Sequence, residues 1–437
     1  MTFSTKVKHD DHIFYPFFPP FHPFSKTFLL QDLPLQKYGY YDTLLTNRKN
    51  RIVINEAGTV MENPFKYGGI VRSPYFAGRK EEVKELSREM INANRVFLVS
   101  PRRMGKTCLL HHLMDRLKTQ GIAVAFIDLN ALPDCRSFAE TVTRRMNQAL
   151  ETNKEKFIQI LSGLRKLRPK LTVGKDGNIE AGVELVAEDK EAIPALIEGL
   201  HQAELLAAQK KKKLVTIIDE FSDLVKYNGL IIEKALRSEI QTHQHIGYIF
   251  AGSEQSLMLS LIQDKTRAFY KMGRIMELGP IAREEYSRFI TNWLSQAEFR
   301  IDPEQLEQIF DMGHDIPLYI QRICHNLWEE MRDGRTISKD LIEQIPKKIV
   351  RQDSPHYEVL WLGTSQGQRI LLKALAKEPD AKPFSKEFQI KYGIGPSSSI
   401  KASFDSLIKK GILYRSLKGD YQFSDYFMMH WINSLME

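Results

Sequence analysis

Cysteine is scarce in this sequence, and long apolar runs are missing. Three cysteines occur among 437 residues, Cys108, Cys135 and Cys324, at spacings that match neither a zinc knuckle nor a CxxC redox pair. An odd count also argues against a disulfide framework, so a reducing, cytoplasmic compartment fits best. The apolar runs have the length of strands, as in Val96–Val99 and Val215–Ile218, whereas a spanning helix needs about 18 apolar residues. These absences exclude a disulfide-rich scaffold and a membrane-spanning role.

Apolar residues as a whole are plentiful. Hydrophobic residues make up 43% of the chain and charged residues 27%, which excludes a wholly disordered polymer and predicts a globular protein with real cores. At about 150 residues per domain, the length predicts roughly three structural units. The 62 lysines and arginines exceed the 54 acidic residues, giving a net charge of +8. This surplus permits an anionic partner, and nucleotide, nucleic acid and an anionic membrane surface all stay open.

Residues 1–60 lack any helical or alternating period. Phenylalanines and prolines interleave in YPFFPPFHPF at 15–24, and no basic start precedes an uninterrupted apolar core, so the segment does not have the pattern of a secretion signal. We expect a poorly ordered tail. An aromatic docking peptide is one alternative, and a true start at Met61 is another.

Between 61 and 280 the pattern is that of an α/β domain. Apolar, strand-like runs recur at Arg95–Ser100, Ala123–Asp128, Lys213–Asp219 and Ile246–Gly252, with helical stretches of crossover length between them. This alternation predicts a mostly parallel sheet flanked by helices. Alternating apolar and polar residues around an Asp-Gly pair also predict a hairpin insertion near 170–185.

After residue 280 the pattern turns helical, and we expect a helical lid domain over 281–355 followed by a winged-helix domain over 356–437. Candidate lid helices are Glu284–Leu294, Pro303–Phe310 and Pro317–Met331. In the last section three helical stretches precede two short strand-like runs, which is the order of a winged helix. These segments are Gln366–Ala376, Ser385–Lys391 and Ser397–Lys410, then Ile412–Ser416 and Tyr421–Phe423.

The strongest chemical signal is SPRRMGKT at 100–107, which matches the phosphate-loop pattern GxxxxGK[ST] except that Ser100 holds the first glycine position. The segment joins an apolar strand to a helix, so backbone N–H groups and the positive helix end can cradle phosphate. Gly105 allows a close approach of the backbone, Lys106 would reach the β and γ phosphates, and Thr107 would coordinate Mg²⁺. The candidate nucleotide-binding residues are Ser100, Pro101, Arg102, Arg103, Met104, Gly105, Lys106, Thr107 and Cys108.

Two further strands end in polar residues. The run LVTIIDEF at 214–221 delivers Asp219 and Glu220 at its carboxyl end, the edge at which α/β sheets place their ligands. Asp219 would hold Mg²⁺ or its water, and Glu220 would orient and deprotonate the water that attacks the γ phosphate. The strand GYIFAGS ends in Ser253, which could sense that phosphate. Together these catalytic candidates favour hydrolysis over binding alone.

Four arginines are candidates for stabilising charge in the transition state, in cis or from a neighbouring subunit. Two of them, Arg102 and Arg103, lie within the phosphate loop, and Arg267 and Arg274 lie downstream. The oligomeric state stays open.

Several segments together resemble the prokaryotic AAA-like ATPases often called archaeal-type ATPases, a family related to the signalling STAND class of phosphate-loop NTPases. The segments are FAGRKEEVKEL at 76–86, the phosphate loop, AFIDL at 125–129, LVTIIDEF, IFAGSEQSLM at 249–258, FYKMGRIMELGPI at 269–281 and GHDIPLYIQ at 313–321. The resemblance covers residues 61–435 and leaves residues 1–60 outside. It implies a phosphate-loop sheet with an additional strand, ATP with Mg²⁺ as ligand, and the roles given above for Lys106, Thr107, Asp219 and Glu220. It also implies that Phe76 and Arg79 lie near the adenine, and a packing role is the alternative for Phe76.

The winged helix widens the choice of function. Apolar residues of Ser397–Lys410 form one stripe, which leaves serines and lysines on a face that can enter a major groove. Around the wing, Lys410, Arg415 and Lys418 could meet phosphates, and docking on the ATPase domain or on another protein is the alternative. Two functions compete. One is an ATPase whose nucleotide state switches a module that binds DNA or a protein partner, and the other is a DNA-binding regulator whose nucleotide is structural and essentially not hydrolysed.

Overall fold

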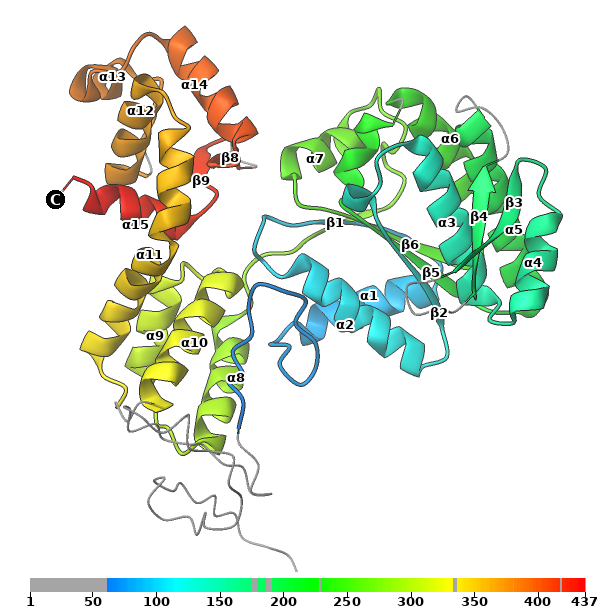
Figure 1. The fold of residues 1–437 in the computed structure, drawn as a ribbon, viewed down its shortest axis with the longest axis horizontal. Coiled ribbons are helices and arrows are strands. Elements are labelled where there is room, and N and C mark those ends of the chain that lie inside the picture. Colours follow the sequence, from blue (N-terminus) through cyan, green and yellow to red (C-terminus); the bar gives the residue numbers. More distant parts are fainter. Residues whose placement is uncertain are drawn as a thin grey trace, which may run out of the picture.

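The structure is a computed structural model, and it describes residues 61–173, 179–185, 191–227, 229–332, 336–379, 381–416 and 419–436. It consists of two lobes, one built on a β-sheet and the other mostly helical (Figure 1). The expected tail at 1–60, the centre of the expected hairpin turn and Lys418 lie outside the described residues.

The first lobe contains a five-stranded sheet in the order β2-β5-β6-β1-β7, and every neighbouring pair is parallel. All residues of β5 and β6 are buried, as expected of apolar strands covered on both faces. The predicted parallel sheet is therefore confirmed, and β7 adds an edge strand that the sequence pattern did not indicate. The strands are β1 Arg95–Val99, β2 Ala123–Asp128, β5 Leu214–Asp219, β6 Ile246–Gly252 and β7 Arg274–Glu277.

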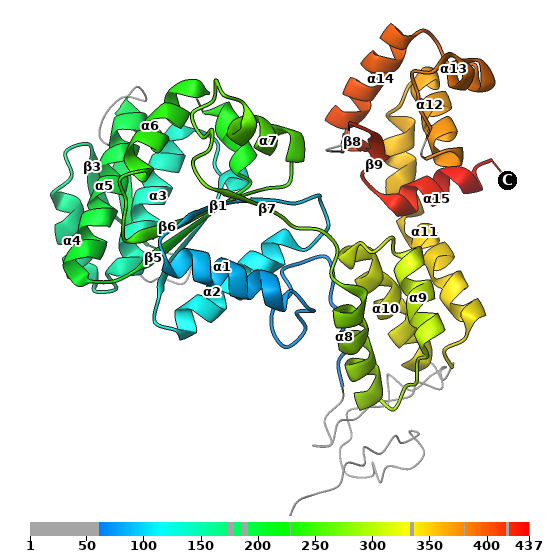
Figure 2. The same ribbon diagram turned by 180° about the vertical axis from the view of Figure 1, so that it is seen from behind.

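Helices cover both faces of this sheet (Figures 1 and 2), because alternate residues of a strand point to opposite sides. On β1, Val96 and Leu98 pack with α1 and α2, whereas Phe97 and Val99 pack with α3, α5, α6 and α7. The sheet is thus the middle of three layers. The covering helices are α1 Lys80–Ile91, α2 Lys106–Thr119, α3 Cys135–Leu150, α5 Ala192–Lys210, α6 Leu230–Ile240 and α7 Gln255–Gln263.

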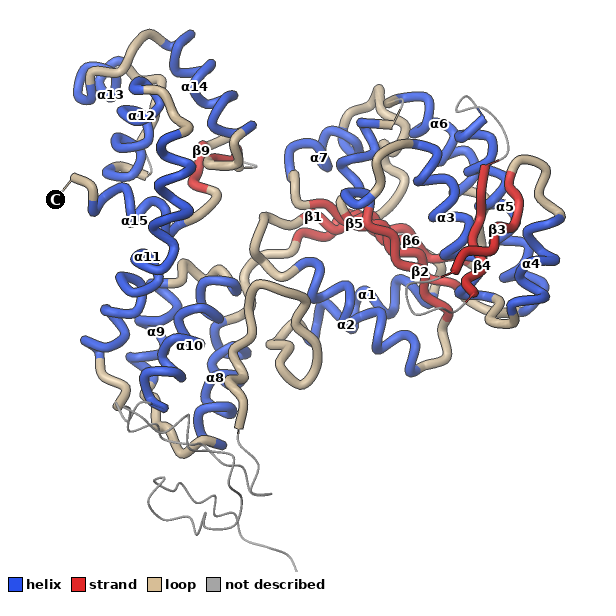
Figure 3. Tube along the Cα trace, viewed as in Figure 1, coloured by secondary structure: helices blue, strands red, loops and turns tan. Residues whose placement is uncertain are grey.

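A two-stranded antiparallel ladder stands apart from the main sheet (Figure 3). It pairs β3 Leu167–Val173 with β4 Ile179–Leu185, and α4 Lys154–Ser162 packs against it. Phe157, Leu161 and Leu167 belong to its own small core. The ladder therefore forms an accessory unit of the first lobe, with α4 and the start of α5 packed against it.

The second lobe contains four long helices followed by a smaller module with the order of a winged helix. In that module Ile400, Phe404 and Leu407 are the buried stripe of α14, as the sequence pattern predicts. The helices of the lid are α8 Arg283–Gln296, α9 Pro303–Met312, α10 Pro317–Arg332 and α11 Lys339–Leu362. The winged helix comprises α12 Gln366–Lys377, α13 Lys386–Tyr392, α14 Ser397–Lys409, β8 Leu413–Arg415, β9 Tyr421–Phe423 and α15 Tyr426–Ser434.

Helix α11 is continuous across residue 355, where the sequence pattern places the end of the lid. It contains two prolines, Pro346 and Pro355, which disrupt the helical signal in the sequence. One hydrophobic core extends from the lid helices into the winged helix, and it includes residues as distant as Tyr286 and Ile432. The lid and the winged helix are thus packed as one body. Among the helices in the described ranges, none is both long and apolar enough to cross a membrane.

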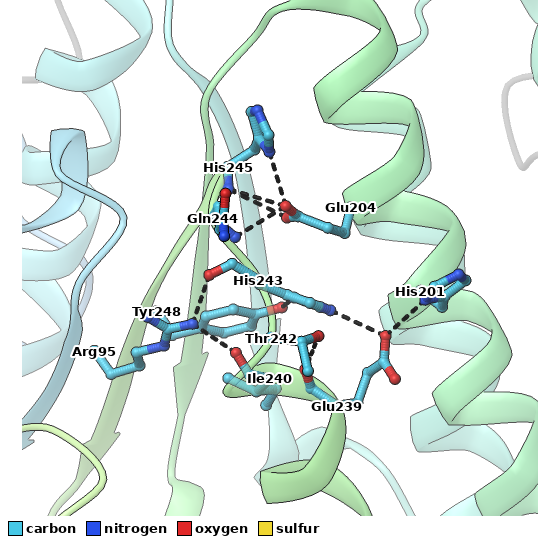
Figure 4. A network of polar contacts seen from close by, with 10 residues as sticks. All are labelled: Arg95, His201, Glu204, Glu239, Ile240, Thr242, His243, Gln244, His245 and Tyr248. Carbon is cyan, nitrogen blue, oxygen red and sulfur yellow. Dashed lines mark hydrogen bonds and ion pairs between the residues drawn. The ribbon is translucent and has the colours of Figure 1, made fainter.

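A polar network fixes the amino-terminal ends of β1 and β6 (Figure 4). The Arg95 guanidinium donates to the carbonyls of Ile240 at 2.6 Å and His243 at 2.7 Å. The His243 ring contacts the Tyr248 hydroxyl at 2.7 Å and a Glu239 carboxylate oxygen at 3.2 Å. Burial lowers the pKa of His243, although Glu239 opposes this shift. The network ties α6 to the sheet, at the end opposite to the one where Asp219 and Ser253 lie.

Candidate nucleotide-binding site

The phosphate loop leaves β1 and leads into the first turn of α2. The backbone N–H of Ser100 donates to the Gly252 carbonyl at 3.2 Å, so the chain follows the sheet as far as this residue. Within residues 100–107 only Arg103 and Gly105 have a positive φ, of 73° and 82°. Ser100 is therefore not in a conformation that requires glycine, and this explains why serine fits at the first glycine position. Gly105 is the N-cap of α2, and the free N–H groups of this helix end favour an anion.

Lys106 connects the loop to the neighbouring strands. Its side chain is 6% exposed, and its Nζ donates to Asp219 and, at 3.0 Å, to Glu220 Oε1. The Thr107 hydroxyl donates to the other oxygen of Asp219 at 3.0 Å. The four residues that the sequence singles out for phosphate, Mg²⁺ and water thus meet at one edge, because the carboxyl ends of β1 and β5 lie on the same side of a parallel sheet.

Glu220 is held in a defined orientation. Its φ is 51°, an uncommon conformation for a residue with a side chain, and its Oε2 accepts hydrogen bonds from the Ser253 hydroxyl at 2.8 Å and the Ser253 N–H at 3.3 Å. Burial acts to raise the pKa of Glu220, but the charge of Lys106 and the hydrogen bonds from Lys106 and Ser253 outweigh it, so this pKa lies below its usual value. Glu220 is therefore a carboxylate at neutral pH, fixed by the end of β6.

A polar cavity of about 1200 Å³ lies in front of these residues. It is lined by the loop residues from Pro101 to Cys108, except for Met104, and by Glu220, Ser253 and Glu254. Three further lining residues are ones that sequence reasoning missed: Asn130, Asp223 and Lys226. The sequence could have indicated these three residues only by their position, because each lies within eight residues of the carboxyl end of β2 or β5.

A second cavity, of about 660 Å³ and mostly apolar, adjoins the first and shares Arg103, Gly105 and Cys108 with it. Met104, Phe76 and Pro317 also line it, so its walls come from the segment before α1, the phosphate loop and the lid. Its place beside the loop and its apolar lining suit a purine base.

Arg79 also lines the apolar cavity, but its guanidinium is held by protein groups. It donates to the carbonyls of Gly279 at 2.6 Å, Met104 at 3.0 Å and Pro280 at 3.2 Å, and it pairs with Glu82. The side chain therefore ties the phosphate loop to the segment that enters the lid. Phe76 stacks on the His112 ring, with centroids 4.3 Å apart.

The arginine candidates separate into two groups. Arg102 and Arg103 line the polar cavity, and Arg102 lies 3.8 Å from a Glu254 oxygen. Arg267 instead binds the buried Glu233 through two nitrogens, and Arg274 pairs with Glu85 and Glu89 on α1. The structure does not bring these last two to the phosphate loop.

The donor set suits Mg²⁺. Hydroxyl and carboxylate oxygens are hard ligands of the kind that this ion prefers, and the Thr107 hydroxyl and an Asp219 oxygen already lie 3.0 Å apart. Thr107 and Asp219 are thus the residues that would hold the ion.

A solved structure of a phosphate-loop ATPase supports the same fold. The Walker-type ATPase paby2304 of Pyrococcus abyssi is 15% identical, with a TM-score of 0.57, over 85% of this chain and 99% of its own. The Aeropyrum pernix ORC1 protein, solved in complex with DNA, is 13% identical, with a TM-score of 0.44, over 83% of this chain and 94% of its own. No protein of curated function matches the sequence.

Two family matches divide the chain. Residues 355–434 match a probable winged helix domain. Residues 76–322, which are more than half of the chain and contain every site residue named above, match the ATPase domain predominantly from Archaea. The protein is therefore a member of this archaeal-type family of phosphate-loop ATPases.

Proposed function

We propose that this protein binds ATP with Mg²⁺, hydrolyses it to ADP and uses the state of the bound nucleotide to switch its winged-helix domain. The observation that carries the proposal is the convergence of Lys106, Thr107, Asp219 and Glu220, with Glu220 held in turn by Ser253. A site that only retained a nucleotide would have no use for an ionised, oriented glutamate beside the phosphate cavity.

Each of these residues has a distinct role. Lys106 exchanges its carboxylate partners for the β and γ phosphate oxygens, which carry the developing charge. Mg²⁺, held by Thr107 and Asp219, would neutralise further charge on the same oxygens. Glu220 then orients the attacking water and accepts its proton, while Ser253 keeps the carboxylate in place.

The packing of the second lobe supports the coupling. Because the lid and the winged helix share one core, a movement of the lid over the nucleotide carries the winged helix with it.

The polar face of α14 is largely open to solvent. Its exposed residues are Ser397, Ser398, Lys401 and Lys409, whereas Ser403 is half-buried. Of the wing residues expected near phosphates, Lys410 donates to the Gly363 carbonyl at 2.7 Å, and Arg415 donates to the Gly419 carbonyl at 3.2 Å.

Binding of labelled duplex DNA by the full-length protein tests the switch. We expect the affinity for DNA to differ between the ATP-bound and ADP-bound protein and to fall as salt rises, because phosphate contacts release counterions. Fluorescence anisotropy in ATP, in ADP and without nucleotide measures it, and Lys401→Ala with Lys409→Ala should weaken any binding by α14. DNA binding that ignores nucleotide would favour a regulator with a structural nucleotide, and no DNA binding would direct the search to a protein partner.

A further inference from the structure

The side chain of Arg103 leaves the phosphate loop and reaches the second lobe. One guanidinium nitrogen donates to the Tyr319 hydroxyl on the lid helix α10, and another binds Asp425 of the winged helix at 3.1 Å. The Tyr319 hydroxyl also accepts the backbone N–H of Tyr426 at 2.8 Å. We call Arg103, Tyr319 and Asp425 the Arg103 latch. At this one point the phosphate loop, the lid and the winged helix are all joined.

The latch is well placed to matter energetically. The side chains of Arg103 and Asp425 are only 27% and 21% exposed, so water screens their attraction less than it does for a surface pair. Burial disfavours the charged guanidinium, but the contacts with Tyr319 and Asp425 outweigh this and raise the pKa of Arg103. Asp425 also caps α15 by accepting the Phe427 N–H at 3.0 Å through its other oxygen, which fixes the carboxylate in place.

Arg103 also belongs to the nucleotide site. It is one of the residues that line both the polar and the apolar cavity, and its backbone lies in the left-handed region with φ 73°. A triphosphate in the polar cavity brings several negative charges to the loop that carries Arg103, whereas the latch offers a single carboxylate. The two anions therefore compete for one guanidinium.

From this geometry we propose that ATP draws Arg103 away from Asp425 and Tyr319 and so releases the winged helix from the phosphate loop. This inference rests on the function proposed above and names the residues that carry the signal. With the latch closed, β8 faces the first lobe across a cavity of about 840 Å³ lined by Ser253, Glu254 and Gln255 on one side and by Leu413, Tyr414 and Arg415 on the other. Figures 1 and 2 both show β8 on the side of its lobe that faces α7. Release would uncover this wing.

Thermodynamic linkage predicts how weakening the Arg103 latch changes the affinity for ATP. If ATP binding must break the latch, then weakening the latch must strengthen ATP binding by the same factor. Asp425→Asn removes the charge, yet it keeps the cap of α15 because asparagine caps helices as well as aspartate does. We expect Asp425→Asn to bind ATP about threefold to tenfold more tightly than the wild type, the range set by loss of one partly buried ion pair.

Isothermal titration of the full-length protein with ATP and Mg²⁺ measures this affinity. Asp302→Asn is the matched control, because Asp302 caps α9 by the same kind of bond, to Gln305, and does not take part in the latch. Tyr319→Phe keeps the ring beneath Arg103 but removes the hydroxyl, and it should shift affinity in the same direction as Asp425→Asn. Unchanged or weaker ATP binding by Asp425→Asn would overturn the latch.

Small-angle X-ray scattering of the wild type separates this inference from the function on which it rests. Expansion of the wild type on adding ATP, without tighter binding by Asp425→Asn, would keep the switch and overturn the latch. If the wild type does not expand on adding ATP, the winged helix is not released. This result would overturn both the latch and the proposed switch, whatever the affinity of Asp425→Asn for ATP. Expansion together with tighter binding by Asp425→Asn is the expected result.

Discussion

Substitution of Glu220→Gln should lower the rate of ATP turnover by about 10²- to 10⁴-fold, the range that a positioned general base contributes, while ATP still binds. Glutamine keeps the length of the side chain and an oxygen that can accept from Ser253, but its amide cannot take a proton from water. The carboxylate that it replaces is ionised at neutral pH, since the pKa of Glu220 lies below its usual value. The substitution therefore removes proton transfer with little change in shape.

The measurement is steady-state ADP release at saturating ATP, with ATP affinity measured in parallel. Glu254→Gln is the matched control, because Glu254 lines the same cavity and is half exposed, with Arg102 3.8 Å away. Ser253→Ala should cause a smaller loss than Glu220→Gln, because it removes one of the bonds that hold Glu220 but leaves the base. Equal turnover in Glu220→Gln and the wild type would exclude Glu220 as the catalytic base.

Replacement of Lys106→Met should abolish hydrolysis and also destabilise the protein without nucleotide. Lys106 is the cation between Asp219 and Glu220, and the side chains of Lys106 and Asp219 are 6% and 4% exposed. Removing one partner leaves a buried carboxylate without its counter-charge, which costs about 3 kcal/mol. We expect a lower apparent unfolding temperature together with loss of turnover.

A second substitution separates the two effects of Lys106→Met. Adding Asp219→Asn neutralises the buried carboxylate, so the double variant should regain much of the lost thermal stability but none of the hydrolysis. Thermal unfolding and ADP release, measured on wild type, both single variants and the double variant, complete a double-mutant cycle. Equal stability of Lys106→Met and the wild type would show that the ion pair does not stabilise this site.

The core of the candidate site could be predicted because the sheet turns short motifs into a spatial arrangement. Parallel strands present their carboxyl ends at one edge, so Lys106 after β1, Asp219 at the end of β5 and Ser253 after β6 must converge. The register even sets Asp128 directly opposite Asp219. Burial and the nearby charges of Asp219 and Glu220 raise the pKa of Asp128.

Contacts between the lobes could not be predicted from local patterns. Arg103 and Asp425 are separated by 322 positions in the sequence, and no periodicity links a loop arginine to the cap of a distant helix. The loop pattern predicts that Arg103 lies beside phosphate, and Arg103 does line the polar cavity. Its side chain, however, binds Tyr319 and Asp425 of the second lobe. Only the packing of α10 and α15 against the loop reveals this.

Helix α11 shows how prolines can hide a long element. Pro346 and Pro355 lie inside it, and a pattern-based boundary falls naturally near the second of them. The helix persists because its apolar residues, among them Ile342, Ile349 and Tyr357, are buried in the core that the lid shares with the winged helix. Tertiary burial here outweighs the local cost of proline.

The most direct test of the account is whether the full-length protein converts ATP to ADP at this site. Release of ADP should be measured in Mg²⁺, in EDTA and with Glu220→Gln in Mg²⁺, after confirming that each sample binds ATP. We predict sustained ADP release from the wild type in Mg²⁺ and release near background in the other two samples. If the wild type binds ATP with Mg²⁺ but releases ADP no faster than Glu220→Gln does, the proposal of hydrolysis is wrong. The bound nucleotide would then be structural.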